Sequence, residues 1–99
     1  MIIYEVNLAI DADIIDDYRA WLRPHVAEIL QLPGFVDARI LEVLDPVPEP
    51  NQIGLCVQYT LRDPASLDHY LIQHAPRMRS EGTDRFDGRF RAHRRVLRG

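Results

Sequence analysis

Residues 18–35 read YRAWLRPHVAEILQLPGF, and this stretch carries most of the information about the fold. Apolar side chains recur through it at intervals of three and four residues, the spacing of one helix face. Pro33 and Gly34 follow, and they predict the end of the helix near Leu32, because the residue before a proline avoids the helical conformation and glycine accepts a left-handed turn. The apolar series is Ile15, Tyr18, Leu22, His25 or Val26, and Ile29.

The residues before this helix predict a strand. Met1–Ile10 alternates apolar and mixed side chains with the two-residue period of a half-buried strand. Asp11 or Asp13 is expected to cap the helix, because a carboxylate accepts hydrogen bonds from its free N–H groups and favours the positive end of its dipole. Pro24 lies inside the helix and cannot donate a hydrogen bond to the preceding turn, so a kink or a restart is expected there.

The rest of the chain predicts three more strands and one more helix. The predicted strands are Phe35–Leu44, Ile53–Leu61 and Phe90–Arg98, and the helix opens at Asp63-Pro64. Residues 45–51 contain three prolines, which block a strand ladder and predict a stiff hairpin loop. Pro76 is expected to disturb the last turns of the second helix. Arg77–Gly88 is polar and is predicted to be irregular or one short helix around Phe86.

The order of these elements is strand, helix, strand, strand, helix, strand. This order predicts a single α+β domain over residues 1–99 with the ferredoxin-like βαββαβ arrangement and a four-stranded antiparallel sheet. Right-handed crossovers then place the first strand between the third and the fourth. Both helices are expected on one face of the sheet, and the other face must meet water or another molecule.

The composition excludes several classes of protein. All twelve basic residues are Arg, the net charge is −3, and no apolar run approaches the ~18 residues of a membrane span. The acidic N-terminal stretch does not resemble a signal peptide, and the single Cys56 excludes an internal disulfide. We therefore expect a cytoplasmic protein without a membrane partner.

The two faces of the sheet leave two arrangements open. If the helices cover the apolar face, Glu5, Asn7, Gln58 and Thr60 point outward and the monomer is self-sufficient. If a second copy covers the apolar face, these polar side chains lie beneath the helices as the floor of a pocket. Pairing of two sheets hides exposed strands and enlarges the core of a small domain, so we expect a homodimer.

Several motifs along the chain resemble the dimeric α/β-barrel superfamily, which includes antibiotic-biosynthesis-type monooxygenases. More closely, the chain resembles a family of small bacterial proteins known only as a domain of unknown function. The resemblance implies a ferredoxin-like fold that pairs into a dimeric α/β barrel, but no activity, because this fold hosts many functions. The residues that carry it are Ile3-Tyr4-Glu5-Val6-Asn7, Trp21-Leu22, His25, Pro33-Gly34-Phe35, Gln58-Tyr59, His74-Ala75-Pro76-Arg77-Met78-Arg79, Gly82, Arg85-Phe86 and Arg94-Arg95.

Two groups of side chains could carry chemistry. Trp21 and His25 lie one helical turn apart and suggest either an imidazole base held against an indole or a partly buried aromatic pair. His74, Arg77 and Arg79, together with Tyr70, could bind a carboxylate or phosphate, or could form ion pairs with acids of the chain. Arg94 and Arg95 point to opposite faces, so one of them could reach the same pocket. The ligand-binding candidates are Asn7, Trp21, His25, Gln58, His74 and Arg77.

Metal, haem and nucleic-acid sites are weakly supported. The four His residues show no paired-ligand spacing, so no metal is expected. Asn7 with His74 is similar to the haem site of haem-degrading members of the superfamily, but the only Trp here lies on the first helix, and no cofactor is expected. The Arg-rich C-terminal part has few aromatic side chains for stacking bases, which makes nucleic acid an unlikely partner.

Three functions remain open at this point. The first is a homodimer that binds a small molecule between sheet and helices. The second is a cofactor-free monooxygenase-like enzyme on an aromatic or polyketide-like substrate. The third is a non-enzymatic interaction module that uses the Arg-rich C-terminal part and the Pro-rich loop.

Overall fold

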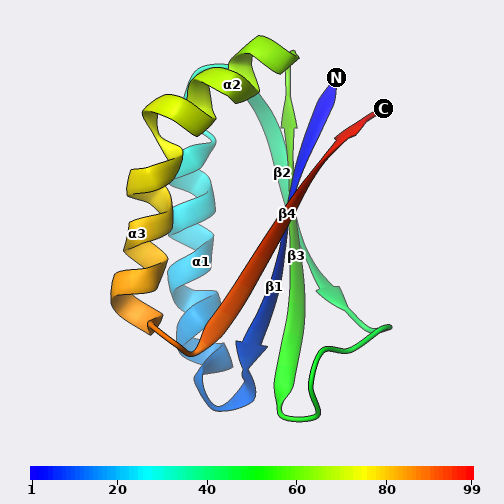
Figure 1. Cartoon of the computed structure of the whole chain (residues 1–99), viewed down its shortest axis with the longest axis vertical. Helices are drawn as coiled ribbons and strands as arrows, with labels where there is room; N and C mark the ends of the chain where they lie inside the picture. The colour runs from blue at the N-terminus through cyan, green and yellow to red at the C-terminus, as the bar shows by residue number, and fades with distance from the viewer.

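A computed structural model describes the whole chain, residues 1–99, as one sheet with helices on one side (Figure 1). The elements in chain order are β1 (Ile2–Asp11), the 3₁₀ helix η1 (Ala12–Ile14), α1 (Ile15–Ile29), β2 (Phe35–Val43), β3 (Gln52–Leu61), α2 (Pro64–Gln73), α3 (Ala75–Phe86) and β4 (Phe90–Arg98). None of the helices has the length and apolar character that crossing a membrane requires.

The sheet has the strand order β2-β3-β1-β4, and every neighbouring pair is antiparallel. The first strand therefore lies between the third and the fourth, which confirms the predicted ferredoxin-like fold. The register aligns Val6 of β1 with Val57 of β3 and with Arg94 of β4. Because side chains alternate along a strand, these three residues share one face of the sheet.

The helices cover the apolar face of the sheet. Tyr4 and Leu8 of β1, and Val57 and Tyr59 of β3, are buried on this face against α1, α2 and α3. The first of the two arrangements left open by the sequence is therefore the one observed. Glu5, Asn7, Gln58 and Thr60 alternate with the buried residues and lie on the opposite, open face.

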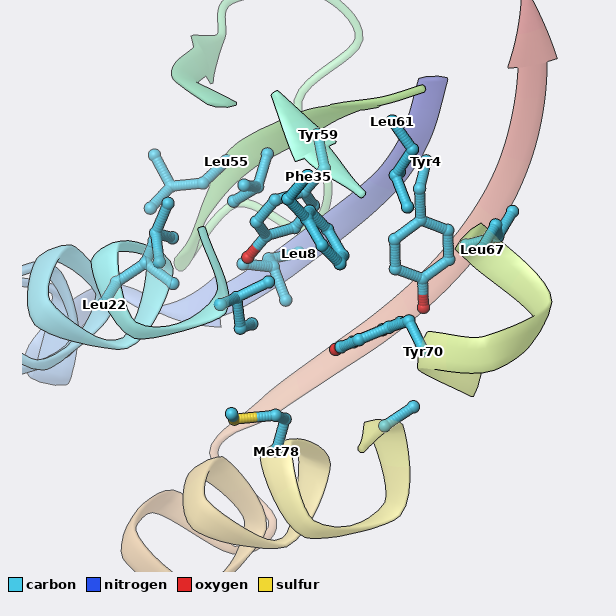
Figure 2. Close-up of a cluster of buried hydrophobic side chains, with 14 of the residues drawn as sticks. Tyr4, Leu8, Leu22, Phe35, Leu55, Tyr59, Leu61, Leu67, Tyr70 and Met78 are labelled. Atoms are coloured by element: carbon cyan, nitrogen blue, oxygen red, sulfur yellow. The ribbon is translucent and has the colours of Figure 1, made fainter. Parts of the chain in front are cut away.

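Aromatic rings form the centre of the core at one end of the sheet (Figure 2). The ring of Phe35 meets those of Tyr59 and Tyr70 edge-on, with centroids 5.6 and 5.1 Å apart. Tyr4 contacts the same two tyrosines at 6.1 and 5.9 Å. Such pairs add roughly 0.5–1.5 kcal/mol each beyond burial alone. Phe35 directly follows Pro33 and Gly34, which separate α1 from β2. Its burial among these rings anchors the end of the α1–β2 connection in the core.

The segment Ala75–Phe86 corrects one sequence prediction. It forms the 12-residue helix α3, which ends at Phe86, rather than an irregular segment or one short helix around Phe86. Pro76 does not disturb α2; it occupies the first turn of α3, where its missing N–H costs no hydrogen bond. Met78, Gly82 and Phe86 follow at four-residue intervals, and all three are buried. Only one face of this helix is apolar, and the polar residues on its other faces obscure the four-residue apolar period in the sequence.

The ends and interior of the first helix differ from expectation in two ways. Neither Asp11 nor Asp13 caps a helix with its side chain; both instead bind Arg89, which precedes β4. No restart occurs at Pro24, because α1 runs unbroken through it. Pro24 and Ala20 are exposed, so water can satisfy the carbonyl that the proline leaves free. Asp63, by contrast, caps α2 as predicted and accepts a 2.8 Å hydrogen bond from the N–H of Ser66.

Candidate functional site

A cavity of about 330 Å³ lies between the sheet and the helices, and we call it the helix-side cavity. Thirteen of its 20 lining residues are hydrophobic. They come from β1, β3 and β4 below and from α1, α2 and α3 above. The volume is at the lower end of the ~300–1,000 Å³ that small-molecule sites span. The thirteen include four tyrosines, whose rings are apolar but carry hydroxyl groups, and the other polar side chains of the lining are His25, Arg79, Thr83, Asp87 and Arg94.

Trp21 and His25 of α1 both line this cavity, as their one-turn spacing allows. Their rings stack with centroids 4.4 Å apart and an interplanar angle of 24°. The outer edge of the indole approaches α3 at Gly82, where a Cβ atom would lie 3.0 Å from Cη2 of Trp21. A glycine at this position therefore lets α1 and α3 approach closely and fixes the position of the indole.

His25 is held in place from α3 as well. Its Nδ1 lies 3.1 Å from Oε2 of Glu81, and only 11% of its side chain is exposed. A carboxylate that binds one ring nitrogen fixes the tautomer and the orientation of an imidazole, and leaves the other nitrogen free to take up a proton. The orientation of His25 beside the indole is thus fixed from two helices.

Four tyrosines bring hydroxyl groups to the apolar cavity. Tyr4, Tyr18, Tyr59 and Tyr70 are each at most 4% exposed, and all four line it. Burial raises the pKa of Tyr70 to about 12, and it raises the pKa values of Tyr18 and Tyr59 further. The hydroxyls of these three residues therefore stay protonated at neutral pH and can donate hydrogen bonds.

Arginines approach the same cavity from the helices and from the edge strand. Arg79 of α3 donates a 3.0 Å hydrogen bond from Nη2 to the hydroxyl of Tyr4. Arg94 of β4 shares the face of Val6 and also lines the cavity. Arg95 lies on the opposite face, so Arg94 is the member of that pair that reaches the site.

The six residues predicted from the sequence do not form one site. Trp21 and His25 line the helix-side cavity. Asn7 and Gln58 lie on the open face of the sheet, which corrects the expectation of a pocket floor beneath the helices. The sheet takes this orientation because burying the fully apolar face removes more hydrocarbon from water.

His74 and Arg77 lie at the junction of α2 and α3, outside the cavity lining. The Nη2 atom of Arg77 is 3.1 Å from Nδ1 of His74, and its Nη1 is 3.7 Å from a carboxylate oxygen of Glu28. The ion-pair alternative therefore describes Arg77, which links α3 to α1 across the surface.

The open face of the sheet holds a separate polar cluster around Glu5. Its carboxylate accepts hydrogen bonds from Asn7 at 3.0 Å and from Gln58 at 2.9 Å, and it pairs with Arg95. These hydrogen bonds, led by that of Arg95, lower the pKa of Glu5 to about 2. Asn7 and Gln58 thus have their partners within the chain, and their first role is to hold a buried carboxylate.

Sequence reasoning did not single out Tyr4, Tyr18 and Gly82 as lining residues, and it grouped Arg79 with His74 and Arg77 rather than with Trp21. The tyrosines fit the apolar patterns of their elements and are easily taken for core alone. Arg79 and Gly82 fall in the segment expected to be irregular, so no helix face related them to Trp21. A four-residue apolar period through Met78, Gly82 and Phe86 was the signal that could have found them.

The side chains do not assemble a metal centre. No three His, Cys, Asp or Glu residues are placed to hold a metal ion together. The haem arrangement suggested by Asn7 and His74 does not fit either, because Asn7 lies on the open face whereas His74 lies on the helix side.

Solved structures share this architecture at low sequence identity. An antibiotic biosynthesis monooxygenase-type protein from Deinococcus radiodurans aligns with a TM-score of 0.72 and 14% identity over 100% of this chain and 92% of its own. SnoaB, a cofactor-independent oxygenase from Streptomyces nogalater, aligns with a TM-score of 0.72 and 10% identity over 99% and 91%. HapK from Hahella chejuensis aligns at 0.69 and 14% over 100% and 92%.

At these identities the likeness shows the fold alone and leaves the activity open. A search of curated proteins found no match. The family comparison covers the entire chain: residues 1–99 match one family, and the protein belongs to it, the domain of unknown function DUF4286.

Proposed function

We propose that this protein binds a small, largely apolar molecule in the helix-side cavity. The observation that carries the proposal is a cavity of about 330 Å³ that is lined by thirteen hydrophobic residues and a few polar groups. This combination is typical of small-molecule sites, whereas protein cores are otherwise packed with few voids larger than a water molecule. His25, Arg79 and Arg94 supply the polar groups that would orient such a molecule.

The fluorescence of Trp21 gives a direct test, because it is the only tryptophan and it lines the cavity. Phenylnaphthylamine, a neutral aromatic probe, should quench Trp21 by energy transfer and saturate at one probe per chain. Ala92→Leu fills the cavity from β4 and should weaken binding about tenfold or more. Ala27→Leu adds the same three carbon atoms at an exposed position of α1 and should leave binding unchanged. Quenching that Ala92→Leu does not reduce would contradict the proposal.

A second candidate is a cofactor-free monooxygenase-like reaction on an aromatic or polyketide-like substrate. It is favoured by the pairing of His25 with Glu81 at the cavity wall. A base at this position would remove a proton from an acidic C–H or O–H group and leave an electron-rich ring that can reduce dioxygen. The likeness to the oxygenase SnoaB extends to the fold and supports this candidate by analogy alone.

Oxygen consumption with an anthrone as substrate tests this second candidate. His25→Ala and Glu81→Gln should each lower the rate, by about 100-fold for the loss of a general base. His74→Ala is the matched control, since that His lies outside the cavity lining. An equal rate in the wild type and His25→Ala would exclude His25 as the base.

We further propose that the protein is a homodimer that pairs through the open face of its sheet. Leu41, which shares this face with Asn7 and Gln58, keeps 40% of its surface exposed in the isolated chain. A small domain enlarges its buried apolar core when a second copy covers such a face. Sedimentation should give a dimer at micromolar concentration and a monomer for Leu41→Glu; a monomeric wild type would reject the idea.

The free, buried thiol of Cys56 favours a reducing compartment, and we propose the cytoplasm. Cell fractionation should recover the protein with cytoplasmic markers, and recovery with an exported fraction would contradict this assignment.

A further inference from the structure

Two arginines at the helix-side cavity have no carboxylate partner. Arg19, Arg77, Arg89 and Arg95 each form an ion pair with an acid of the chain, whereas Arg79 and Arg94 form none. The remaining arginines also lack such pairs, but only these two line the cavity. Asp87 is the single acid among the lining residues, so the fixed charges there are two positive and one negative. Two guanidinium groups, both of exposed residues, therefore have donors to spare at the wall of an apolar space.

The hydroxyl groups of three buried tyrosines that line the cavity also lack hydrogen-bond partners within the chain. Tyr18, Tyr59 and Tyr70 are 2–4% exposed, and no protein group hydrogen-bonds their hydroxyls. No covered polar side-chain atom in this structure is left unpaired, so each of these hydroxyls retains some accessible surface. Because all three residues line the cavity, that surface faces it. Figure 2 shows Tyr70 beside Tyr4, whose hydroxyl points from the sheet toward the helices.

The arginines and the tyrosine hydroxyls line one cavity, and Arg79 donates to Tyr4, whose ring centroid lies 5.9 Å from that of Tyr70. Burial raises the pKa values of Tyr18, Tyr59 and Tyr70, and the positive charge of Arg94 opposes the rise in all three. Arg79 opposes it at Tyr70 and donates directly to Tyr4. Neutral phenols and guanidinium groups are all donors, and the group that accepts from several donors at once is an anionic oxygen.

We propose that the cavity takes an aromatic carboxylate, with its ring against Trp21 and its carboxylate held by Arg79, Arg94 and the neighbouring tyrosine hydroxyls. This inference rests on the proposed binding function and names the chemical class of its ligand. A neutral aromatic molecule offers these donors no charged acceptor, whereas a carboxylate can accept from the arginines and from the hydroxyls together.

Two probes with one skeleton separate this inference from the binding function itself. Anilinonaphthalenesulfonate carries an anionic group on the ring system of the neutral phenylnaphthylamine. Energy transfer from Trp21 reports both probes, and far-UV circular dichroism confirms that each variant is folded. The variants are Arg94→Gln, Arg79→Gln and the double variant. Arg91→Gln is the matched control, because Arg91 lies on the same strand but on the open face.

The wild type should bind the anionic probe more tightly than the neutral one. The double variant should lose about tenfold or more in affinity for the anionic probe, because a hydrogen bond to a charged group is removed at each position, and should keep its affinity for the neutral probe. Naphthoate should displace the anionic probe from the wild type, and the neutral naphthamide should do so less well. Arg91→Gln should match the wild type throughout.

Other outcomes overturn the inference in distinguishable ways. Equal affinity of the wild type for both probes, or equal losses for both in the double variant, would reject a carboxylate ligand while leaving the binding function intact. A loss in Arg91→Gln as large as that in Arg94→Gln would assign the effect to overall charge. If neither probe quenches Trp21, the binding function fails and the inference fails with it.

Discussion

The two faces of the sheet use polar side chains in opposite ways. On the open face, Glu5 is 3% exposed and accepts hydrogen bonds from Asn7, Gln58 and Arg95, so its polar cluster is complete without a ligand. On the helix side, tyrosine hydroxyls and two exposed arginines that form no ion pair line an apolar cavity.

This difference shows how a structural polar group is told apart from a binding group. A buried polar atom without a partner costs free energy, so a chain either pairs it internally or leaves it facing a space that water or a ligand can enter. By this criterion the polar cluster of the open face is structural, and the helix side is the face on which we propose that a ligand binds.

The largest effect that separates the two faces should come from truncating their apolar side chains. Leu55→Ala removes a side chain that is 1% exposed beneath the helices and should cost about 3 kcal/mol of unfolding free energy. Leu41→Ala on the open face should cost less than about 1 kcal/mol in the monomer, because its side chain is 40% exposed. Urea denaturation at several protein concentrations measures both.

The two variants should also differ in how protein concentration affects them. The loss in Leu55→Ala should be the same at every concentration, whereas that in Leu41→Ala should grow with concentration, because it acts through the proposed dimer. Equal costs for the two truncations would contradict the assignment of the core to the helix side.

The contact between α1 and α3 should be the next most sensitive feature. Gly82→Val places new atoms against Cη2 of Trp21, where even a Cβ would lie only 3.0 Å away. Overpacking of this kind typically costs about 1–3 kcal/mol, and we expect about 2 kcal/mol together with a shifted emission of Trp21. Asp84→Val, on an exposed position of the same helix, should change neither. An unchanged emission in Gly82→Val would show that the indole does not depend on this glycine.

The polar cluster of the open face should give a smaller effect with a characteristic pH dependence. The pKa of Glu5 is lowered from 4.5 to about 2 in the folded chain, so the folded state favours the carboxylate. Its contribution to stability is therefore present above about pH 4.5 and is lost as the pH falls toward 2. Since Arg95 is 64% exposed and water screens the pair, Glu5→Gln should cost about 1 kcal/mol at neutral pH.

Denaturation of the wild type and Glu5→Gln across this pH range tests that expectation. The stability difference between them should shrink below about pH 4.5, and Glu49→Gln, in the loop between β2 and β3, should behave like the wild type. A difference that is constant across the range would mean that the carboxylate charge is not what the cluster stabilises.

The fold could be predicted from the sequence because its signals are local. Alternating strands, the Pro33-Gly34 stop and the cap at Asp63 each act over a few residues, and the order of elements then limits the topology. The helix α3 was not predicted because it contains two residues, Pro76 and Gly82, that are unfavourable inside a helix. Pro76 starts the helix, and Gly82 makes room for Trp21.

The site could be predicted only in part because it depends on which face of the sheet the helices cover. Trp21 and His25 lie on one helix, so their spacing alone related them correctly. Asn7 and Gln58 were related to them through the sheet, and the alternation of side chains sends both to the far face. No local pattern reports that choice, since it is set by the total apolar area buried.

We propose that a small molecule binds on the helix side of the sheet and not on the open face. Nitrogen–proton correlation spectra test this proposal most directly. The indole N–H of Trp21 and the side-chain amides of Asn7 and Gln58 give separate signals on the two sides of the sheet. On titration with phenylnaphthylamine, we predict shifts at Trp21 and at the amide of Gly82, with the Asn7 and Gln58 amides unmoved. Shifts at Asn7 and Gln58 with Trp21 unmoved would contradict the account.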